Sequence, residues 1–248
     1  MHKTVLVTGG AQRVGRSICL GLANAGYAVA VHHNSSTEAA EELVAEISAN
    51  GGQAVRVKAD LSDSNDTRGL IDRAIAELGP IGLLVNNASL FEEDSLDNLD
   101  DELWDKHFAV HVKAPTLLAS SFAAQKLNDG LIVNMIDERV WKLTPNFTSY
   151  TLSKSTLWTA TKTMAQALAP TIRVNAIGPG PTLPSYRQSQ QDFDAQLQAL
   201  LLKRAPELSE FTNTILYFAA AKSVTGQMIA LDGGQHLGWQ TPDQAAPE

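Results

Sequence analysis

The chain has 248 residues, of which 44% are hydrophobic, and its formal net charge at pH 7 is −8. This length and apolar content are enough to bury the core of one large α/β domain. The negative charge argues against broad binding to nucleic acids or anionic membranes, and no apolar run of 18 residues predicts a membrane span.

Short β-branched runs alternate with longer amphipathic stretches along the chain. The predicted strands are residues 4–7, 28–32, 54–57, 83–86, 131–135, 173–177 and 228–231. The predicted helices are residues 14–25, 37–50, 63–78, 101–127, 149–167 and 210–221. This alternation, with short connections, predicts a single doubly wound parallel sheet of about seven strands, Rossmann-type, with helices on both faces.

One domain is predicted over residues 1–240, with a substrate loop at about residues 183–205 that carries no known motif. The tail, residues 241–248, is expected to fray. A single cysteine, Cys19, leaves no partner for an internal disulfide, and the start MHKTVLVTGG lacks the layout of a secretion signal. Both features predict a cytoplasmic protein.

A glycine-rich turn, TGGAQRVG at residues 8–15, follows the first strand and opens the first helix. Glycines permit a tight turn and let backbone N–H groups approach a pyrophosphate, and the helix N-terminus adds partial positive charge. The turn therefore predicts a dinucleotide site, although an ordinary βα turn can have the same composition.

Two features favour NADP(H) over NAD(H). The second strand ends in HHNSS, residues 32–36, with no acid to accept from a ribose 2′-hydroxyl. Arg13 adds a permanent cation that can meet a 2′-phosphate, unless it is only a solvated surface residue. No metal site is predicted, because adjacent His32 and His33 on a strand point to opposite faces.

Tyr150 and Lys154 lie four residues apart, so both project from one face of a helix. A neighbouring ammonium favours the phenolate of a tyrosine, and the lysine can also hold the nicotinamide ribose. The pair predicts an acid–base centre. The alternative interpretation is that the two residues only happen to lie on the same face of a surface helix and have no catalytic role.

The order of these motifs resembles the short-chain dehydrogenase/reductase family over almost the whole chain. The motifs are Thr8–Gly15, Asp60-Leu61, Asn86-Asn87-Ala88, Tyr150-x₃-Lys154, Arg173-Val174-Asn175, Pro179-Gly180, Thr225-Gly226-Gln227 and Asp232-Gly233-Gly234. The resemblance implies that Asp60 lies near the adenine, that Asn86 and Ala88 line the cofactor, and that Thr182 lies near the nicotinamide. It also implies a homotetramer.

A narrower resemblance, to the pteridine reductase branch and the related dihydromonapterin and dihydrofolate reductases, rests on Arg13, on Asn87-Ala88-Ser89 and on Asp137 in place of the usual serine. In that branch a phenylalanine, here Phe91, stacks on the pterin. Ser89 is left open as a helix cap, a substrate ligand or a phosphate ligand. His111 stands where the family has the asparagine of a proton relay, and it either replaces that asparagine or is structural.

Asp137 separates the possible substrate classes. An ionised carboxylate only accepts hydrogen bonds, so it would repel the oxyanion that forms when a ketone is reduced. A pteridine ring is rich in N–H groups, and reduction of its C=N bond requires a proton on nitrogen. A carboxylate can accept hydrogen bonds from the N–H groups, and a carboxyl group whose pKa is raised by burial can supply the proton. The alternative is that Asp137 caps a turn, paired with Arg139.

The predicted function is NADPH-dependent transfer of a hydride to the C=N bond of a dihydropterin or dihydrofolate. The alternatives are a short-chain reductase of another carbonyl or imine, and a non-catalytic dinucleotide-binding regulator, against which Tyr150 and Lys154 argue. The predicted catalytic residues are Asp137, Tyr150, Lys154 and His111, and the predicted substrate contacts are Phe91, Ser89, Asp137 and Tyr150. The predicted cofactor contacts are Gly9, Arg13, Val14, Gly15, His33, Asn34, Ser35, Asp60, Leu61, Asn87, Ala88, Ser89, Tyr150, Lys154, Pro179, Gly180 and Thr182.

Overall fold

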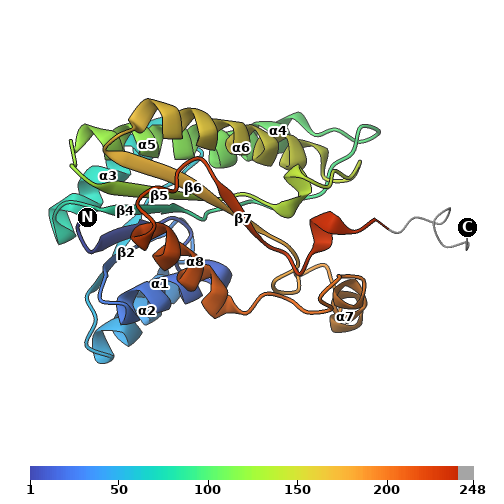
Figure 1. Ribbon diagram of the computed structural model, residues 1–248, viewed down its shortest axis with the longest axis horizontal. Helices are drawn as coiled ribbons and strands as arrows, with labels where there is room; N and C mark the ends of the chain where they lie inside the picture. The colour runs from blue at the N-terminus through green and yellow to red at the C-terminus, as the bar shows by residue number, and fades with distance from the viewer. Residues whose placement is uncertain (240–248) are drawn as a thin grey trace, which may run out of the picture.

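The computed structural model describes residues 1–239, and the predicted tail, residues 241–248, lies outside them. Seven parallel strands form one sheet in the order β3-β2-β1-β4-β5-β6-β7 (Figure 1). The strands are β1 (Thr4–Val7), β2 (Ala28–His33), β3 (Ala54–Lys58), β4 (Leu83–Asn86), β5 (Gly130–Met135), β6 (Ile172–Pro179) and β7 (Met228–Leu231). The predicted Rossmann-type α/β fold is confirmed.

Helices cover both faces of the sheet (Figure 1). The helices are α1 (Arg13–Asn24), α2 (Thr37–Ala49), α3 (Ser64–Leu78), α4 (Asp101–Phe108), α5 (Ala114–Ala124), α6 (Thr148–Leu168), α7 (Gln190–Gln198) and α8 (Leu208–Ala220). Short helical segments are η1 (Ala109–Lys113), η2 (Glu138–Val140) and η3 (Gln235–Leu237). Within the described residues, no helix is long and apolar enough to cross a bilayer.

The core consists of two main layers, one on each side of the sheet. In β1, Val5 and Val7 pack against α1, α2 and α8, whereas Leu6 packs against the layer under α3, α5 and α6. All four residues of β1 are buried because both faces of the strand are covered. Burying each such side chain contributes roughly 1.5–3 kcal/mol.

The helix predicted over residues 101–127 is interrupted. α4 passes into the π-helical segment η1, and α5 follows with Pro115 in its first turn. The apolar pattern runs through all three segments, so it gave no sign of the change in hydrogen bonding. A π-helical turn re-aims the side chains that it carries, and His111 is one of them.

The predicted substrate loop contains a helix that was not expected. α7 reads QQDFDAQLQ, and only Phe193 in it is buried. Its polar composition conceals the helical pattern. The helix begins at Ser189, whose hydroxyl accepts from the backbone N–H of Asp192 at 3.1 Å. α7 lies beyond the carboxyl ends of the strands (Figure 1), where ligands bind in open α/β sheets.

Candidate active site

A cleft of about 450 Å³ opens where β1 and β4 diverge at their carboxyl ends. It is lined by most of the predicted cofactor contacts: Gly9, Arg13, Val14, Gly15, His33, Asn34, Asp60, Leu61, Asn87, Ala88, Ser89, Tyr150, Lys154 and Pro179. Gly180 and Thr182 line an adjoining pocket of about 480 Å³. Ser36 lines the cleft in place of the predicted Ser35. A hollow of about 660 Å³ near Met1 and Asp129 contains none of the predicted site residues.

The glycine-rich turn leaves the N-terminus of α1 open to this cleft. Gln12, at the N-cap, makes no side-chain cap hydrogen bond, so the first N–H groups of α1 are available to an anion. The turn also packs very tightly: a Cβ added to Gly15 would lie 2.1 Å from the carbonyl oxygen of Gly9 and 2.7 Å from Nδ2 of Asn87. Only glycine fits there, and the backbone donors fit the pyrophosphate of a dinucleotide.

His32 fixes the turn to the second strand. Its Nδ1 accepts from the N–H of Gly9 at 2.9 Å, and its Nε2 lies 3.2 Å from the carbonyl oxygen of Ala59. The tautomer with the proton on Nε2 satisfies both contacts. Burial is the main cause that lowers the pKa of His32 from 6.5 to about 4. The ring is therefore neutral at pH 7.

Acid should weaken the fold through His32. The unfolded chain takes up a proton near pH 6.5 and the folded chain only near pH 4, so this stability is present above pH 6.5 and is lost as the pH falls to 4. The loss can reach roughly 3 kcal/mol. We expect the free energy of urea unfolding to fall more steeply between pH 6.5 and 4 in the wild type than in His32→Asn, whose amide oxygen can still accept from Gly9. Equal slopes for the two proteins would contradict this role.

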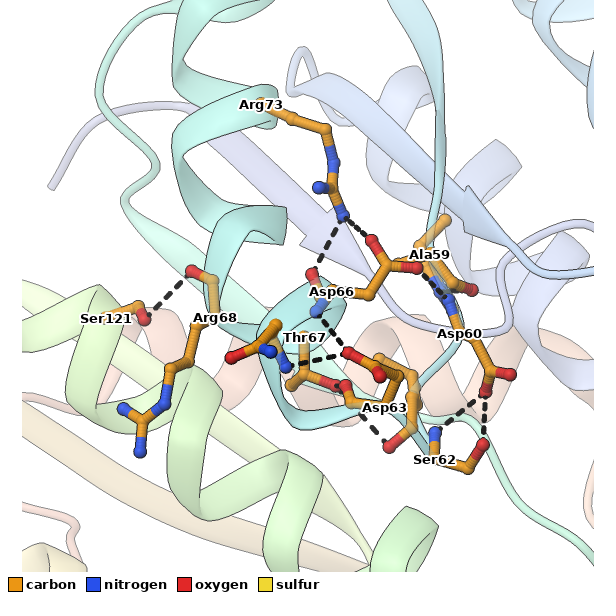
Figure 2. Close-up of polar contacts among 12 residues, drawn as sticks. Ala59, Asp60, Ser62, Asp63, Asp66, Thr67, Arg68, Arg73 and Ser121 are labelled. Carbon is orange, nitrogen blue, oxygen red and sulfur yellow. Dashed lines mark hydrogen bonds and ion pairs between the residues drawn. The ribbon is translucent and has the colours of Figure 1, made fainter.

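The loop after β3, which lines the cleft with Asp60 and Leu61, is held by its own polar network (Figure 2). The backbone N–H of Asp60 donates to Asp66, at 2.6 Å, and the carboxylate of Asp60 accepts from both the N–H and the hydroxyl of Ser62. These two bonds to Ser62 are the main cause that lowers the pKa of Asp60. Arg73 in turn holds Asp66 at 2.8 Å. The loop is thus held in place by hydrogen bonds within the chain.

The end of β2 carries a buried nitrogen that has no partner. His33 is 2% exposed, its Nδ1 lies 3.2 Å from the carbonyl oxygen of Asn34, and its Nε2 is unpaired within the described residues. Burial, opposed by that backbone contact, lowers the pKa of His33, and the positive charges of Arg56 and Lys58 lower it further. Because Nδ1 faces a carbonyl oxygen, it carries the proton of the neutral ring, and Nε2 is a hydrogen-bond acceptor.

Arg13 occupies a left-handed conformation, with φ of 51°. Its guanidinium donates to the carbonyl oxygens of Leu183 and Pro184, at 3.3 and 3.1 Å. It lines both the cleft and the adjoining pocket. Arg13 therefore connects the glycine-rich turn to the segment that follows β6, a contact that the sequence did not indicate.

Asp137 and Tyr150 are in direct contact. The phenol of Tyr150 donates to Oδ2 of Asp137 at 2.8 Å, and Oδ1 of Asp137 accepts from the backbone N–H of Arg139 at 2.9 Å. Asp137 is thus both the cap of η2 and the partner of Tyr150, so the two interpretations of this residue are compatible. The guanidinium of Arg139 lies over the rings of Phe91 and Phe147, 5.1 Å from each ring centre.

The expected phenolate is not favoured in this arrangement. Burial first, and then the carboxylate of Asp137, raise the pKa of Tyr150 well above its ordinary value. Lys154 does not reverse this effect: its Nζ donates to the carbonyl oxygen of Met135 at 2.9 Å, and burial lowers the pKa of Lys154 to about 8. The expectation from the sequence considered the effect of Lys154 on the pKa of Tyr150 and left out the effect of the Asp137 carboxylate. Tyr150 is therefore a neutral phenol.

His111 lies behind Tyr150 and does not line either cavity. Its Nδ1 is 2.8 Å from the hydroxyl of Ser153, which itself donates to the carbonyl oxygen of Tyr150. Its Nε2 accepts from the N–H of Leu90 at 3.0 Å and lies 3.1 Å from the hydroxyl of Ser89. Burial is the main cause that lowers the pKa of His111. This neutral ring supports the backbone on both sides of the site, and its part in a proton relay stays a prediction.

The ring of Phe91 stacks on another aromatic ring of the same chain, that of Phe147. The rings of Phe91 and Phe147 stack at 4.5 Å and 11°, and Tyr150 meets Phe91 edge-on at 4.8 Å. The guanidinium groups of Arg139 and Arg187 lie 5.1 and 5.5 Å from the centre of the Phe91 ring. Stacking of Phe91 on a substrate stays a prediction, because Phe147 occupies one place where a flat ring would fit.

The sequence argument did not find several residues of the site. Phe147, Arg187 and Gln235 line the pocket beside Phe91 and Asp137, and Gln12 and Leu90 line the cofactor cleft. Gln12 stands inside the glycine-rich turn but is not one of its characteristic residues, and the other four stand in no motif. For residues 1–239, no group of three or more His, Cys, Asp or Glu side chains could hold a metal ion.

Residues 3–195 match the short chain dehydrogenase family. The chain is 57% identical to FolM alternative dihydrofolate reductase 1 from Brucella suis, solved in complex with NADP, over 99% of this chain and 100% of that one, with a TM-score of 0.95. The Brucella canis protein, also complexed with NADP, is 56% identical over 98% of each chain, with a TM-score of 0.93. A 3-oxoacyl-[acyl-carrier-protein] reductase of Staphylococcus epidermidis is 31% identical over 96% of this chain and all of its own length. The chain belongs to the short-chain dehydrogenase family.

Proposed function

We propose that this chain is an NADPH-dependent reductase of a pteridine, acting on the C=N bond of a dihydropterin or dihydrofolate. The observation that carries the proposal is the carboxylate of Asp137, which follows the carboxyl end of β5. It accepts a hydrogen bond from the phenol of Tyr150, with 2.8 Å between the two oxygens. The similarity to two FolM alternative dihydrofolate reductases complexed with NADP supports it.

The cofactor would supply the hydride, and this chain's residues would bind it and manage the proton. The open N-terminus of α1 and Arg13 would hold the phosphates, and Lys154 would hold the nicotinamide ribose. A proton shared by two oxygens 2.8 Å apart can pass to a basic atom placed beside them. In a dihydropteridine that atom is the ring nitrogen of the C=N bond, which becomes basic as the adjacent carbon is reduced.

A second candidate is reduction of a carbonyl group, as the name of the Staphylococcus epidermidis relative indicates for that protein. Asp137 argues against it, because a carboxylate beside a forming oxyanion raises the energy of the transition state. A non-catalytic regulator is a third candidate, against which the Asp137–Tyr150 contact argues.

The decisive experiment is a turnover assay of the purified chain with NADPH and, separately, 7,8-dihydrobiopterin, dihydrofolate and a simple ketone. The proposal expects NADPH oxidation with at least one of the two pteridines and little with the ketone. Activity with the ketone alone would favour the carbonyl reductase. Cofactor binding without turnover of any substrate would favour the regulator.

Replacing Arg13 by Ala should weaken NADPH binding and leave NADH binding nearly unchanged, since a guanidinium interacts with the 2′-phosphate that only NADPH carries. Dissociation constants from fluorescence titration measure the effect. The matched control is Lys126→Ala, which removes one positive charge far from the cleft. A wild-type chain that binds NADPH and NADH equally well would contradict the predicted preference. If Arg13→Ala lost affinity for both cofactors equally, Arg13 would have only a structural role, through its contacts with Leu183 and Pro184.

We also propose that the chain works in the cytoplasm as a homotetramer built from a single domain over residues 1–240. The single cysteine supports a reducing compartment, and the family resemblance supports the tetramer. Light scattering coupled to size-exclusion chromatography measures the assembly, and fractionation of expressing cells measures the location.

A further inference from the structure

The helix that carries Tyr150 and Lys154 begins without a cap of its own. Phe147 precedes α6 in a left-handed conformation, with φ of 58°, and makes no side-chain cap hydrogen bond. Tyr150 lies in the first turn of α6, and the first turn is the part of a helix that frays when its N–H groups lack partners. The place of the phenol therefore depends on what holds this turn.

A buried carboxylate from the segment after β4 caps the turn. Both side-chain oxygens of Asp94 accept from the backbone N–H of Ser149, each at 3.1 Å, and its backbone oxygen accepts from the N–H of Thr148 at 3.3 Å. Asp94 is only 2% exposed, and within residues 1–239 no cationic side chain forms an ion pair with it. Its charge faces the positive end of α6 instead.

Two histidines hold the same helix from the side. Nδ1 of His107, in α4, lies 2.6 Å from the hydroxyl of Ser149, and Nδ1 of His111, in η1, lies 2.8 Å from the hydroxyl of Ser153. The serines and the histidines have the same spacing along their helices, so the two contacts form parallel rungs. The ring of His107 also meets the ring of Tyr150 edge-on at 5.9 Å. Ser149 is thus fixed from outside α6 through both its N–H and its hydroxyl.

The phenol that meets Asp137 at 2.8 Å belongs to the residue that follows Ser149. A shift of about 1 Å in the first turn would stretch that contact, and a misplacement of this size can cost about 100-fold in rate. Lys154 lies one turn further along α6 and is held separately, by the carbonyl oxygen of Met135. Loosening the first turn should therefore displace the phenol and leave the lysine in place.

We propose that Asp94 and His107 are positioning residues, which hold Ser149 and so keep the phenol of Tyr150 in reach of Asp137 and of the substrate. The proposal rests on the proposed function, in which this phenol takes part in proton transfer. Neither Asp94 nor His107 lines the cofactor cleft or the adjoining pocket. Their effect should therefore appear in the chemical step and not in the binding of substrate or cofactor.

The test removes each hold on Ser149 in turn. Asp94→Ala removes the cap, and Ser149→Ala or His107→Leu removes the hydroxyl contact. Each change should lower kcat for 7,8-dihydrobiopterin by about tenfold or more, with KM and the dissociation constant of NADPH within about twofold of the wild type. The double variant of Ser149 and His107 should lose no more than either single one. Asp94→Asn keeps an accepting oxygen, and its kcat should stay within about threefold of the wild type because Asn and Asp cap helices equally well.

Two matched controls separate position from stability. Asp100 caps α4, which packs against α6, by accepting from the N–H of Leu103 at 3.0 Å. Asp100→Ala should lower the free energy of urea unfolding and leave kcat per NADPH-binding site unchanged. Thr156→Ala removes an exposed hydroxyl from α6 and should change neither quantity. Equal losses of kcat in the alanine variants of Asp94 and Asp100, or parallel losses of kcat and binding, would overturn the inference.

Hydrogen exchange gives a readout that needs neither turnover nor an Asp94→Ala chain that folds. The amides of the first turn of α6 should exchange about tenfold faster in Ser149→Ala than in the wild type, with those of its last turn unchanged. Unchanged exchange in the first turn would overturn the inference with pteridine reduction intact. Failure of the wild type to reduce either 7,8-dihydrobiopterin or dihydrofolate would overturn the proposed function, and the exchange would still show whether these contacts hold the turn.

Discussion

Replacing Asp137 by Asn is expected to lower the turnover of a dihydropteridine by about 10²–10⁴-fold, the range for loss of a general acid–base group. The size of the side chain is kept, and its one oxygen can still accept from either Tyr150 or Arg139. The amide cannot take up or release a proton near neutral pH. The measurement is kcat at saturating NADPH.

Two further results distinguish this role from a structural one. NADPH affinity should stay close to wild type, because Asp137 is not one of the predicted cofactor contacts. Asp137→Ser should also lose pteridine activity, and it should gain some activity on simple ketones because it restores a donor. Pteridine turnover in Asp137→Asn within a few-fold of the wild type would leave Asp137 as the cap of η2 alone.

Tyr150→Phe is expected to reduce kcat by a similar factor, about 10²–10⁴-fold. The phenol holds the proton of the pair in the ligand-free site, and its removal leaves Oδ2 of Asp137 without its donor. The ring still packs against Phe91 and His111, so the fold around it should be kept. Single-turnover kinetics with bound NADPH measure the chemical step directly.

The control for this change is Tyr217→Phe, which removes a phenol from the exposed face of α8 and should leave kcat unchanged. No ketone activity should appear in Tyr150→Phe, since the carboxylate of Asp137 remains. If Tyr150→Phe kept nearly full turnover, the proton would have to reach the substrate from Asp137 without the phenol.

The sequence predicted the sheet because its strands are short and doubly buried. β1, β4 and β5 read as continuous apolar runs, and Asp137 and Tyr150 each stand at a fixed place relative to a strand end or a helix start. The sheet brings these ends together whatever the loops between them contain. That is why a carboxylate and a phenol 13 residues apart could be assigned to one site, where they meet at 2.8 Å.

The rest of the site depends on contacts that have no sequence pattern. Arg187 lies over Phe91, 96 residues away, only because α7 and its loop fold back across the pocket. The turn to π-helix at His111 changes the hydrogen bonds without changing the apolar spacing. The pKa of Tyr150 depends on burial and on Asp137, and neither effect could be weighed before the distance between them was known.

The order of strands in the sheet has a consequence for how the chain folds. β1 joins β2 and β3 into one half of the sheet, yet its other neighbour, β4, comes after all of them in the chain. Every pairing joins parallel strands that are separated by at least one helix, so all contacts within the sheet are non-local and folding should be slow. The cleft lies on the seam between the two halves: Thr8 donates to Val85 across it, and Asn87 donates to Gly9. Cofactor affinity should therefore appear only when the halves have docked, and the cofactor should act as a clamp that stabilises the docked state.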